Sequence, residues 1–243
     1  MAPIPVYIGY DEKETIAFWV AAHSITSRSS IPVAIIPLRR ELLSGTFDRP
    51  RAELDSTDFS NSRWIVPNLQ GYKGWAVFVD CDVLFQADIA DLWAQRDDQH
   101  DVMVKMHNHV PRETTKFLGA TQTQYERKNW SSLMLMNCDK CTALTRRVVN
   151  TSPGLWLHQM RWADAIGAIE GSWNLLVGYD KSVPNPQMVH FTSGGPWHGY
   201  NDIPYATRWW NEYNAMIQGG NPVNYLELHN GPDPIQERHQ DQQ

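Results

Sequence analysis

The chain has 243 residues, of which 42% are hydrophobic and 20% are charged, and this globular balance excludes a disordered chain, a collagen-like repeat and a coiled coil. We expect neither a membrane-spanning helix, which needs roughly 18 or more uninterrupted apolar residues, nor a secretory signal, because the first residues lack a basic start and an apolar stretch. The net charge of −6, without a strong basic cluster, argues against nucleic acid or an anionic membrane as the main partner.

The first part of the chain alternates short apolar runs with amphipathic stretches, which is the order of an α/β protein. It predicts strands over residues 4–9, 33–38 and 75–79, and helices over residues 12–27 and 60–68. Residues 39–60 are expected to form a loop with short helical pieces. The last run, WAVFV, is apolar throughout, as expected for a central strand between parallel neighbours.

Two of these helices carry start signals. Asp11 lies three residues before Glu14, an arrangement that resembles a capping box, and Ser60 is the expected cap of helix 60–68. Apolar residues follow at helical spacing in helix 12–27 and predict an amphipathic helix. They are Ile16, Trp19, Val20 and His23.

The second part continues the alternation. It predicts strands over residues 83–85, 101–106, 133–136 and 188–192. Helices are predicted over residues 88–95, with Asp88 as the cap, 139–149, 154–168 and, as the C-terminal helix, 207–217. We therefore expect one α/β domain over residues 1–230 and a polar tail over residues 231–243.

Three cysteines fit a reducing compartment better than a disulfide framework. Cys138 and Cys141 form one CxxC, which without a second pair is weak evidence for a metal or redox site. The alternative is two ordinary thiols at the junction of a strand and a helix. We expect a cytoplasmic protein, with peripheral contact to an inner membrane left open.

The strongest chemical signal is Asp80-x-Asp82 at the carboxyl end of the apolar strand 75–79. Ligands bind at the carboxyl ends of strands in open α/β sheets. Two adjacent carboxylates repel each other unless a cation neutralises them, and a hard divalent metal would also receive diphosphate oxygens. The alternative is a pair of solvated turn aspartates.

A second signal lies in the segment 190–197, where His190 ends a strand and Gly194 and Gly195 follow. The glycine loop presents backbone N–H groups to an anion, and the imidazole would complete a metal site. One nitrogen beside two carboxylates favours Mn²⁺ over Mg²⁺. A structural histidine is the alternative.

Two further signals point to a nucleotide. Gly9 allows close backbone approach, Tyr10 offers a stacking face, and Asp11 accepts hydrogen bonds from a base or ribose. Arg63, in the helix before the Asp80-x-Asp82 strand, is a candidate phosphate partner. The alternatives are a plain capped turn and a surface salt bridge.

Taken in order, these four signals resemble the glycosyltransferases of family 8 and their bacterial relatives, a group that includes glycogenin-like enzymes and lipopolysaccharide galactosyl- and glucosyltransferases. The similarity runs from about residue 4 to residue 197. It is carried by IGYDEKE, SRWIVPNLQGYKGWAVFVDCDVLFQADIADLW, SSLMLMNCDK, LHQMRWADAIGAIEGSWNLL and HFTSGGPW. The resemblance implies a single GT-A, Rossmann-like domain, in which helices flank a mostly parallel central sheet, with a C-terminal helical extension.

The resemblance also implies a UDP-sugar donor, UDP-glucose or UDP-galactose, and Mn²⁺ or Mg²⁺ as cofactor. Asp80, Asp82 and His190 would hold the metal, and Asp80 would also face the donor. The other donor-binding residues implied are Gly9, Tyr10, Asp11, Arg63, Lys128, Asn129, Ser132, Gly194 and Gly195. The acceptor would be a glycan or another hydroxyl compound.

The candidate catalytic residue is Gln159, which matches the glutamine of the family's Asp-Gln pair near the anomeric carbon. Here His158 replaces the acidic partner, and Asp164, further along the same predicted helix, is the candidate to supply the carboxylate. The family's lysine in the late histidine motif is replaced by Gly195, so Arg63, Lys128 or another cation must neutralise the charge of the phosphates.

Family membership would imply transfer with retention of the anomeric configuration. Without a clear carboxylate nucleophile, we expect front-face attack, in which the leaving phosphate takes the acceptor proton. Two alternatives stay open: a metal-dependent phosphohydrolase or nucleotidyltransferase, and a non-catalytic nucleotide-sugar-binding domain. The sequence also leaves open acceptor contacts by His107 and His109.

Overall fold

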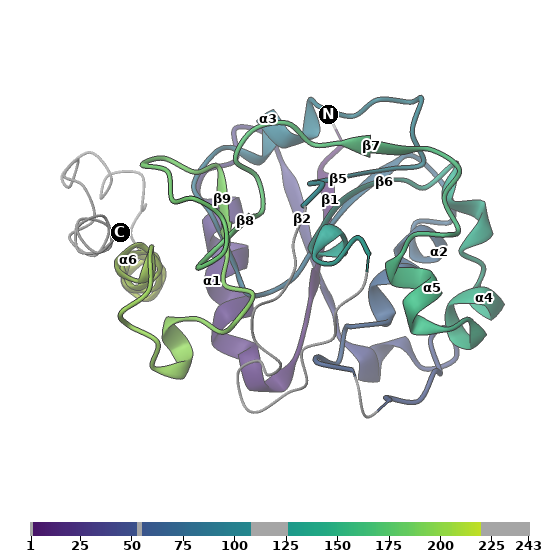
Figure 1. Ribbon diagram of the computed structural model, residues 1–243, viewed down its shortest axis with the longest axis horizontal. Helices are drawn as coiled ribbons and strands as arrows, with labels where there is room; N and C mark the ends of the chain where they lie inside the picture. The colour runs from purple at the N-terminus through teal and green to yellow at the C-terminus, as the bar shows by residue number, and fades with distance from the viewer. Residues whose placement is uncertain (1, 53–54, 108–125, 220–243) are drawn as a thin grey trace.

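The computed structural model describes residues 2–52, 55–107 and 126–219 (Figure 1). The predicted tail over residues 231–243, the end of the predicted domain and His109 therefore lie outside the described residues. Within the described part, no helix has the length and apolar character needed to cross a membrane.

A six-stranded sheet forms the centre of the molecule, in the strand order β2-β1-β3-β6-β5-β7 (Figure 1). The strands are β1 (Ile4–Gly9), β2 (Val33–Leu38), β3 (Trp75–Val79), β5 (Val102–Val104), β6 (Leu133–Asn137) and β7 (Ile166–Ala168). Pairs β1–β2, β1–β3 and β5–β7 are parallel, whereas β3–β6 and β5–β6 are antiparallel. The sheet is mostly parallel, as predicted, but β3 has a parallel neighbour on one side only.

A second, smaller sheet lies beside the first and has the order β4-β9-β8. Its strands are β4 (Val83–Phe85), β8 (Leu175–Leu176) and β9 (Met188–His190). The chain enters it directly after β3, and β4 pairs antiparallel with β9. This pairing brings residues near position 190 beside residues near position 83.

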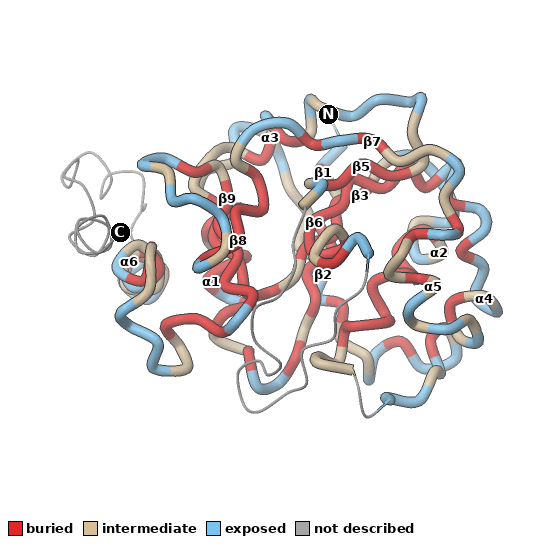
Figure 2. The backbone as a smooth tube through the Cα atoms, in the orientation of Figure 1, coloured by how far each residue is buried: buried red, intermediate tan, exposed pale blue. Residues whose placement is uncertain are grey.

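Helix α1 (Thr15–Thr26) contributes residues to two hydrophobic cores, and Figure 2 shows buried backbone along it. Phe18 and Ile25 pack with the central sheet, whereas Val20 packs with the smaller sheet and the C-terminal helix α6 (Ala206–Gln218). The prediction that α1 has a single apolar face is wrong, because the helix is buried on two sides. Trp19, which was predicted on the apolar face, is 54% exposed.

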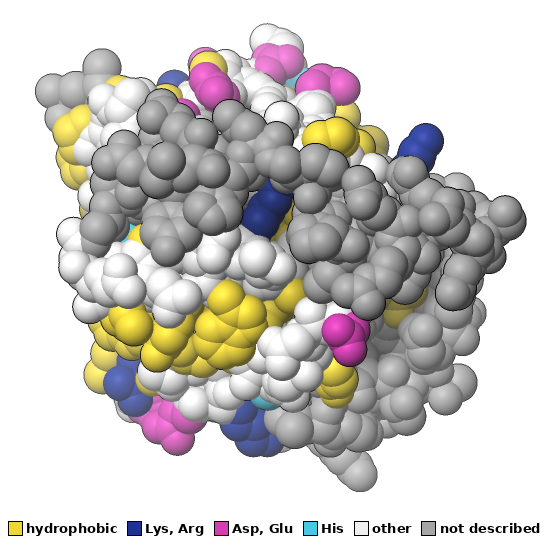
Figure 3. Space-filling model, turned by 90° about the vertical axis from the view of Figure 1, so that its left-hand side faces the viewer, with side chains coloured by type: hydrophobic (Ala, Val, Ile, Leu, Met, Phe, Trp, Pro, Cys, Tyr) yellow, Lys and Arg dark blue, Asp and Glu magenta, His cyan; other side chains and the backbone are white. Residues whose placement is uncertain are grey.

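Helix α6 stands at the outer edge of the molecule, next to α1 (Figure 1). Its Glu212 is buried and binds His23 and Arg28, both at 2.6 Å. Its other face exposes Trp210 and Ile217, and Figure 3 shows hydrophobic side chains gathered on this side of the molecule.

The remaining helices are short. They are α2 (Val66–Leu69), α3 (Ile89–Trp93), α4 (Arg146–Thr151) and α5 (Gly154–His158). The predicted helix 60–68 is a 3₁₀ turn, Ser62–Ile65, followed by α2, and its start is Asn61 rather than Ser60. Ser60 Oγ instead accepts a hydrogen bond from Thr57 N at 3.0 Å.

Two predicted helices in the second part are shorter than expected. In place of helix 139–149, a 3₁₀ turn, Cys141–Ala143, precedes α4, because Thr145 caps a new helix through a bond from Val148 N to its Oγ1. Helix 154–168 ends at His158, where Met160 adopts a left-handed φ of 51°. Residues 166–168 are strand β7, since they pair with β5.

Candidate metal and donor site

The site forms where the carboxyl ends of β1 and β3 meet the amino end of β6. Ile8 pairs with Val79, and Val79 pairs with Leu133, so the residues that follow β1 and β3 lie beside those that precede β6. Asp80 N donates to the carbonyl of Ser132 at 3.0 Å. This edge is where open α/β sheets bind ligands.

Asp82 and His190 come together through the second sheet. Val83 pairs with His190, and Phe191 N donates to the Asp82 carbonyl at 2.9 Å. His190 Nε2 lies 3.3 Å from Asp82 Oδ1, and His190 and Asp82 are 2% and 8% exposed. Asp80, Asp82 and His190 each offer a ligand atom, and these atoms lie within 4.8 Å of one another.

Asn174 fixes the orientation of the His190 imidazole. Its amide nitrogen donates to the Asn129 carbonyl at 3.2 Å and to Ser132 Oγ at 2.9 Å. Because a carbonyl can only accept, the Asn174 oxygen faces His190, whose Nδ1 lies 2.9 Å away and donates to it. The Nε2 lone pair is then directed away from Asn174 and is available to a cation.

Sequence reasoning missed Asn174. The available signal was an asparagine inside the apolar run 173–176, since a fully buried amide requires partners. Its φ of 58° is left-handed, a conformation that asparagine tolerates better than most residues.

Arg63 is buried beneath Asp80 and is not a surface residue. Its guanidinium forms an ion pair with Asp80 Oδ1 at 2.8 Å and donates to the Ser131 carbonyl at 2.8 Å. Ser131 Oγ in turn lies 3.2 Å from Nδ1 of His158, at the end of α5. Arg63 therefore orients Asp80 and connects it to α5.

A buried carboxyl group lies behind the two aspartates. Glu14 is 1% exposed, and the Cys81 thiol donates to its Oε2 at 3.5 Å. Burial raises the pKa of Glu14 well above its usual value, and the carboxylate of Asp82 raises it further. Sequence reasoning assigned Glu14 only to a helix start, whereas its burial and the neighbouring Asp82 favour the uncharged form of its carboxyl group.

The segment after β1 is built as a capped turn. Asp11 caps the 3₁₀ helix Glu12–Glu14, with Oδ1 accepting from Lys13 N at 2.9 Å and Oδ2 from Asp58 N at 3.0 Å. Tyr10 OH bonds Thr15 Oγ1 at 3.0 Å. Gly9 is required by the Phe59 ring, because a β carbon at position 9 would lie 2.4 Å from it.

The predicted glycine loop follows β9. Gly194 N donates to the Phe191 carbonyl at 2.8 Å, and its φ of 106° suits only glycine. A β carbon at Gly195 would lie 2.0 Å from the Trp197 ring, so the second glycine admits this aromatic side chain.

The structure separates the candidate catalytic residues. His158 ends α5 and is linked to the site through Ser131. Gln159 follows it, and its Oε1 accepts from Arg161 Nε at 2.8 Å. Asp164 is exposed and precedes β7 at its amino end, where its N–H donates to Asp101 Oδ2. This is the opposite edge of the sheet, so Asp164 cannot supply the carboxylate expected from the resemblance.

The turn before β6 holds the remaining candidates. Lys128 is buried, and Asn129 has a left-handed φ of 63°. The Asn129 carbonyl also accepts from Ser132 Oγ at 2.6 Å. Asn129 and Ser132 thus support the Asn174–His190 pair through their hydrogen bonds.

The other residues left open by the sequence lie elsewhere. His107 Nδ1 is 3.7 Å from Asp180 Oδ2. Cys138 and Cys141 are buried free thiols, directed at the carbonyls of Met136 and Asp101. Burial raises the pKa of Cys138 to about 12, so the thiol is uncharged at neutral pH. Among the described residues, neither cysteine belongs to a cluster that could hold a metal ion.

The side chains that could coordinate a metal at this site fit a divalent cation. Two carboxylates and one imidazole nitrogen suit Mn²⁺ or Mg²⁺, and the nitrogen favours Mn²⁺. The fixed imidazole tautomer supports this fit, because metal-binding histidines commonly donate their second nitrogen to a neighbouring acceptor.

Comparisons with known proteins agree with this architecture. No family model matches the chain. Protein CDI of Arabidopsis thaliana is 45% identical over 222 residues, which cover 86% of each protein. The structure resembles the glycosyltransferase GlyE of Streptococcus pneumoniae TIGR4, with a TM-score of 0.60 and 13% identity, over 90% of this chain and 63% of the GlyE chain. It also resembles the galactosyltransferase LgtC, solved with donor and acceptor sugar analogs, with a TM-score of 0.59 and 12% identity, over 87% of this chain and 96% of that one. These likenesses show the GT-A fold.

Proposed function

This chain belongs to the same family as Protein CDI of Arabidopsis thaliana, and from that premise and its GT-A fold we propose that it is a metal-dependent glycosyltransferase. It moves a hexose from a UDP-sugar, UDP-glucose or UDP-galactose, to a hydroxyl of a glycan or another acceptor. The convergence of Asp80, Asp82 and His190 at the ligand-binding edge of the sheet carries this proposal. The family 8 resemblance of the sequence supports the choice of donor.

The three side chains would hold Mn²⁺ or Mg²⁺, which when bound acts as a Lewis acid and offsets the charge on the leaving diphosphate. Arg63 holds Asp80 in place through their ion pair. Asn174 holds the imidazole of His190. In the loop at Gly194 and Gly195, the Gly194 N–H is bound to the Phe191 carbonyl, so the loop would offer the Gly195 N–H to an anion.

The reaction breaks the bond between the anomeric carbon and the diphosphate oxygen and forms a bond from that carbon to the acceptor oxygen. The acceptor proton passes to the leaving phosphate oxygen, so UDP departs intact. Attack from the same face retains the anomeric configuration and needs no carboxylate nucleophile. Gln159, at the end of α5, orients the sugar and shields the developing positive charge.

The cysteines support the proposal that this protein works in a reducing compartment such as the cytoplasm. All three thiols are buried and free, which is the usual state of cysteine in a reduced cell interior.

A thermal-shift panel of UDP-glucose, UDP-galactose and UDP, each with Mn²⁺ or with EDTA, tests donor and metal together. We expect stabilisation only when nucleotide and metal are both present, because each completes the coordination of the other. The matching turnover assay follows release of UDP. Release of inorganic phosphate or pyrophosphate instead would contradict transfer and identify a phosphohydrolase or nucleotidyltransferase.

Two aspartate variants sharpen this test. Asp82→Asn removes a buried metal ligand and should lower turnover at least about 100-fold, the loss typical of one preorganised electrostatic group. Asp164→Asn, at the opposite edge of the sheet, should keep wild-type turnover. Equal loss in both variants would contradict the assignment of the site.

A further inference from the structure

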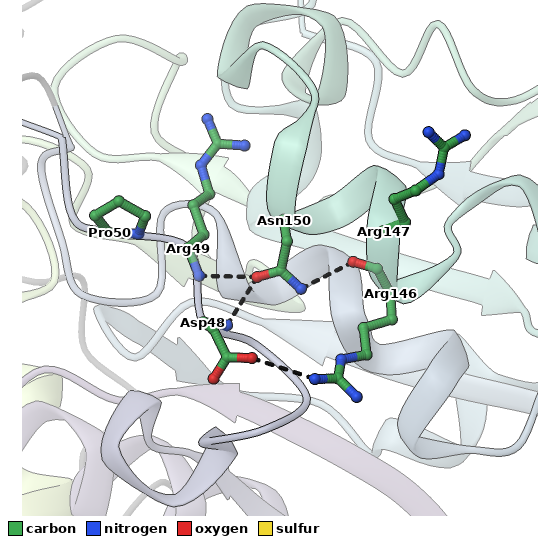
Figure 4. A pocket seen from close by; sticks show the side chains of 6 residues that line it. All are labelled: Asp48, Arg49, Pro50, Arg146, Arg147 and Asn150. Atoms are coloured by element: carbon green, nitrogen blue, oxygen red, sulfur yellow. Dashed lines mark hydrogen bonds and ion pairs between the residues drawn. The ribbon is translucent and has the colours of Figure 1, made fainter.

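A pocket of about 520 Å³ lies outside the proposed active site, between α4 and the loop over residues 48–50 (Figure 4). Its lining consists of six residues. They are Asp48, Arg49, Pro50, Arg146, Arg147 and Asn150. None of them belongs to the metal cluster or to the glycine loop after β9, so the proposed function leaves this pocket without a role.

Asn150 builds the pocket by joining α4 to the loop. Its Oδ1 accepts from the backbone N–H groups of Asp48 at 2.7 Å and Arg49 at 2.8 Å. Its amide nitrogen donates to the carbonyls of Thr46 at 3.1 Å and Arg146 at 2.8 Å. One side chain thus satisfies four backbone groups, of which those of Asp48, Arg49 and Arg146 are drawn in Figure 4. The bonds hold the two walls at a fixed separation.

The charge of the pocket is strongly positive. Its lining carries three guanidinium groups and one carboxylate, a net charge of +2 in a chain whose net charge is −6. Asp48 Oδ2 lies 3.3 Å from Arg146 Nη2, and both side chains are more than half exposed, so this pair is weak. Asp48 Oδ1 is used by Gly45 N at 2.7 Å.

The other two guanidinium groups are not neutralised by carboxylates in the described part of the chain. Arg49 donates to the carbonyls of Ser152 at 2.5 Å and Val149 at 3.4 Å, which fixes its position but leaves its charge. Arg147 is exposed on the first turn of α4, one residue after Arg146.

We propose that this pocket binds a phosphate dianion, either inorganic phosphate or the phosphate group of a small monoester. A dianion matches the +2 charge of the lining, and the planar guanidinium fork donates two parallel hydrogen bonds to a phosphate. Arg49 provides a fixed donor. Arg146 and Arg147 extend from α4 in different directions in Figure 4, and because both side chains are exposed they would turn toward a bound phosphate. Binding would also release Arg146 from its weak pair with Asp48.

Isothermal titration at constant ionic strength and in EDTA tests the proposal, with inorganic phosphate in one arm and glucose 6-phosphate in the other. We expect saturable binding of one equivalent in at least one arm, and the tighter arm identifies the source of the phosphate. The double variant Arg146→Gln, Arg147→Gln should weaken binding at least tenfold. Arg147→Gln alone, at an exposed side chain, should weaken it severalfold without affecting the fold.

Two controls separate this pocket from the proposed active site. Arg96→Gln removes an exposed arginine that stacks on Trp93 and should leave phosphate binding unchanged. Asp82→Asn should lose metal-dependent UDP-sugar binding yet keep phosphate binding. The proposal is overturned if neither ligand binds saturably, or if the double arginine variant binds as tightly as the wild type.

Discussion

A single buried amide determines which nitrogen of His190 faces the two aspartates. The Asn174 oxygen can serve only as the acceptor for His190 Nδ1, because its nitrogen is committed to Asn129 and Ser132. The imidazole is therefore held in one tautomer before any cation arrives. We expect that this preorganisation contributes to metal affinity rather than to the fold alone.

Asn174→Ala should weaken Mn²⁺ binding by roughly 10- to 100-fold, the range typical of losing a partner that orients a metal ligand. Titration of Mn²⁺ followed by electron paramagnetic resonance measures this change directly. Asn68→Ala is the matched control, since the side-chain amide of Asn68 donates to Tyr72 OH and lies on α2, away from the three candidate ligands. If Asn174→Ala bound Mn²⁺ as tightly as the wild type, the orienting role would be refuted.

Glu14 should make the free energy of unfolding depend on pH, and this can be measured in EDTA, which keeps metal ions from the site. Because its pKa is raised well above the ordinary value of 4.5, the native state binds the proton more tightly than the unfolded chain does. Because the native state then binds more protons, the free energy of unfolding falls as pH rises, by at most about 1.4 kcal/mol per pH unit for one group.

Glu14→Gln mimics the protonated carboxyl and should remove this fall. Urea unfolding of both proteins from pH 5 to pH 8 should show the variant gaining stability relative to the wild type as pH rises. Parallel curves for the two proteins would show that Glu14 is ionised in the native state.

Among the elements, α1 and α6 are joined by a buried charged group. Glu212 on α6 binds His23 and Arg28, which lie on and just after α1. Arg28 is nearly as buried as Glu212, so removing the carboxylate leaves a cation in an apolar environment. This buried contact holds α6, which contributes to the second core, against α1.

Glu212→Ala should lower the free energy of unfolding by about 3 kcal/mol, as found when one partner of a buried pair is removed. Urea denaturation measures the loss. Glu170→Ala, at an exposed glutamate, should change stability by less than about 0.5 kcal/mol. A similar small effect of both substitutions would contradict a structural role for the buried group.

The elements also show what the sequence could predict. Apolar runs predicted β1, β2 and β3 to the residue, because a continuous apolar run between turn residues is a local signal. Helix 154–168 failed because β7 is stabilised by pairing with β5, a contact that no local period encodes. The burial of α1 on two sides was missed for the same reason, since the second core is assembled from distant segments.

The candidate site could be predicted in part. Asp80, Asp82 and His190 stood out by residue type at strand ends, and the β4–β9 pairing brings them together. Asn174 and Glu14 were missed as members of the site, because their roles depend on burial and on partners far along the chain. Asp164 was misplaced as a direct result of the wrong helix.

At the scale of the whole molecule, the two sheets meet at the proposed metal site. The chain passes from β3 of the central sheet through Asp80 and Asp82 into β4 of the smaller one, and the smaller sheet returns His190. The site therefore requires both cores to be folded. The described structure thus explains how residues 108 positions apart along the sequence, Asp82 and His190, form one cluster.

A crystal structure with Mn²⁺ and UDP tests the central claim most directly, because the anomalous signal of manganese locates the ion. The account predicts one strong anomalous peak, bound by Asp80, Asp82 and His190 Nε2 and by oxygens of the diphosphate. A manganese peak at another position, or UDP bound away from these three residues, would contradict it.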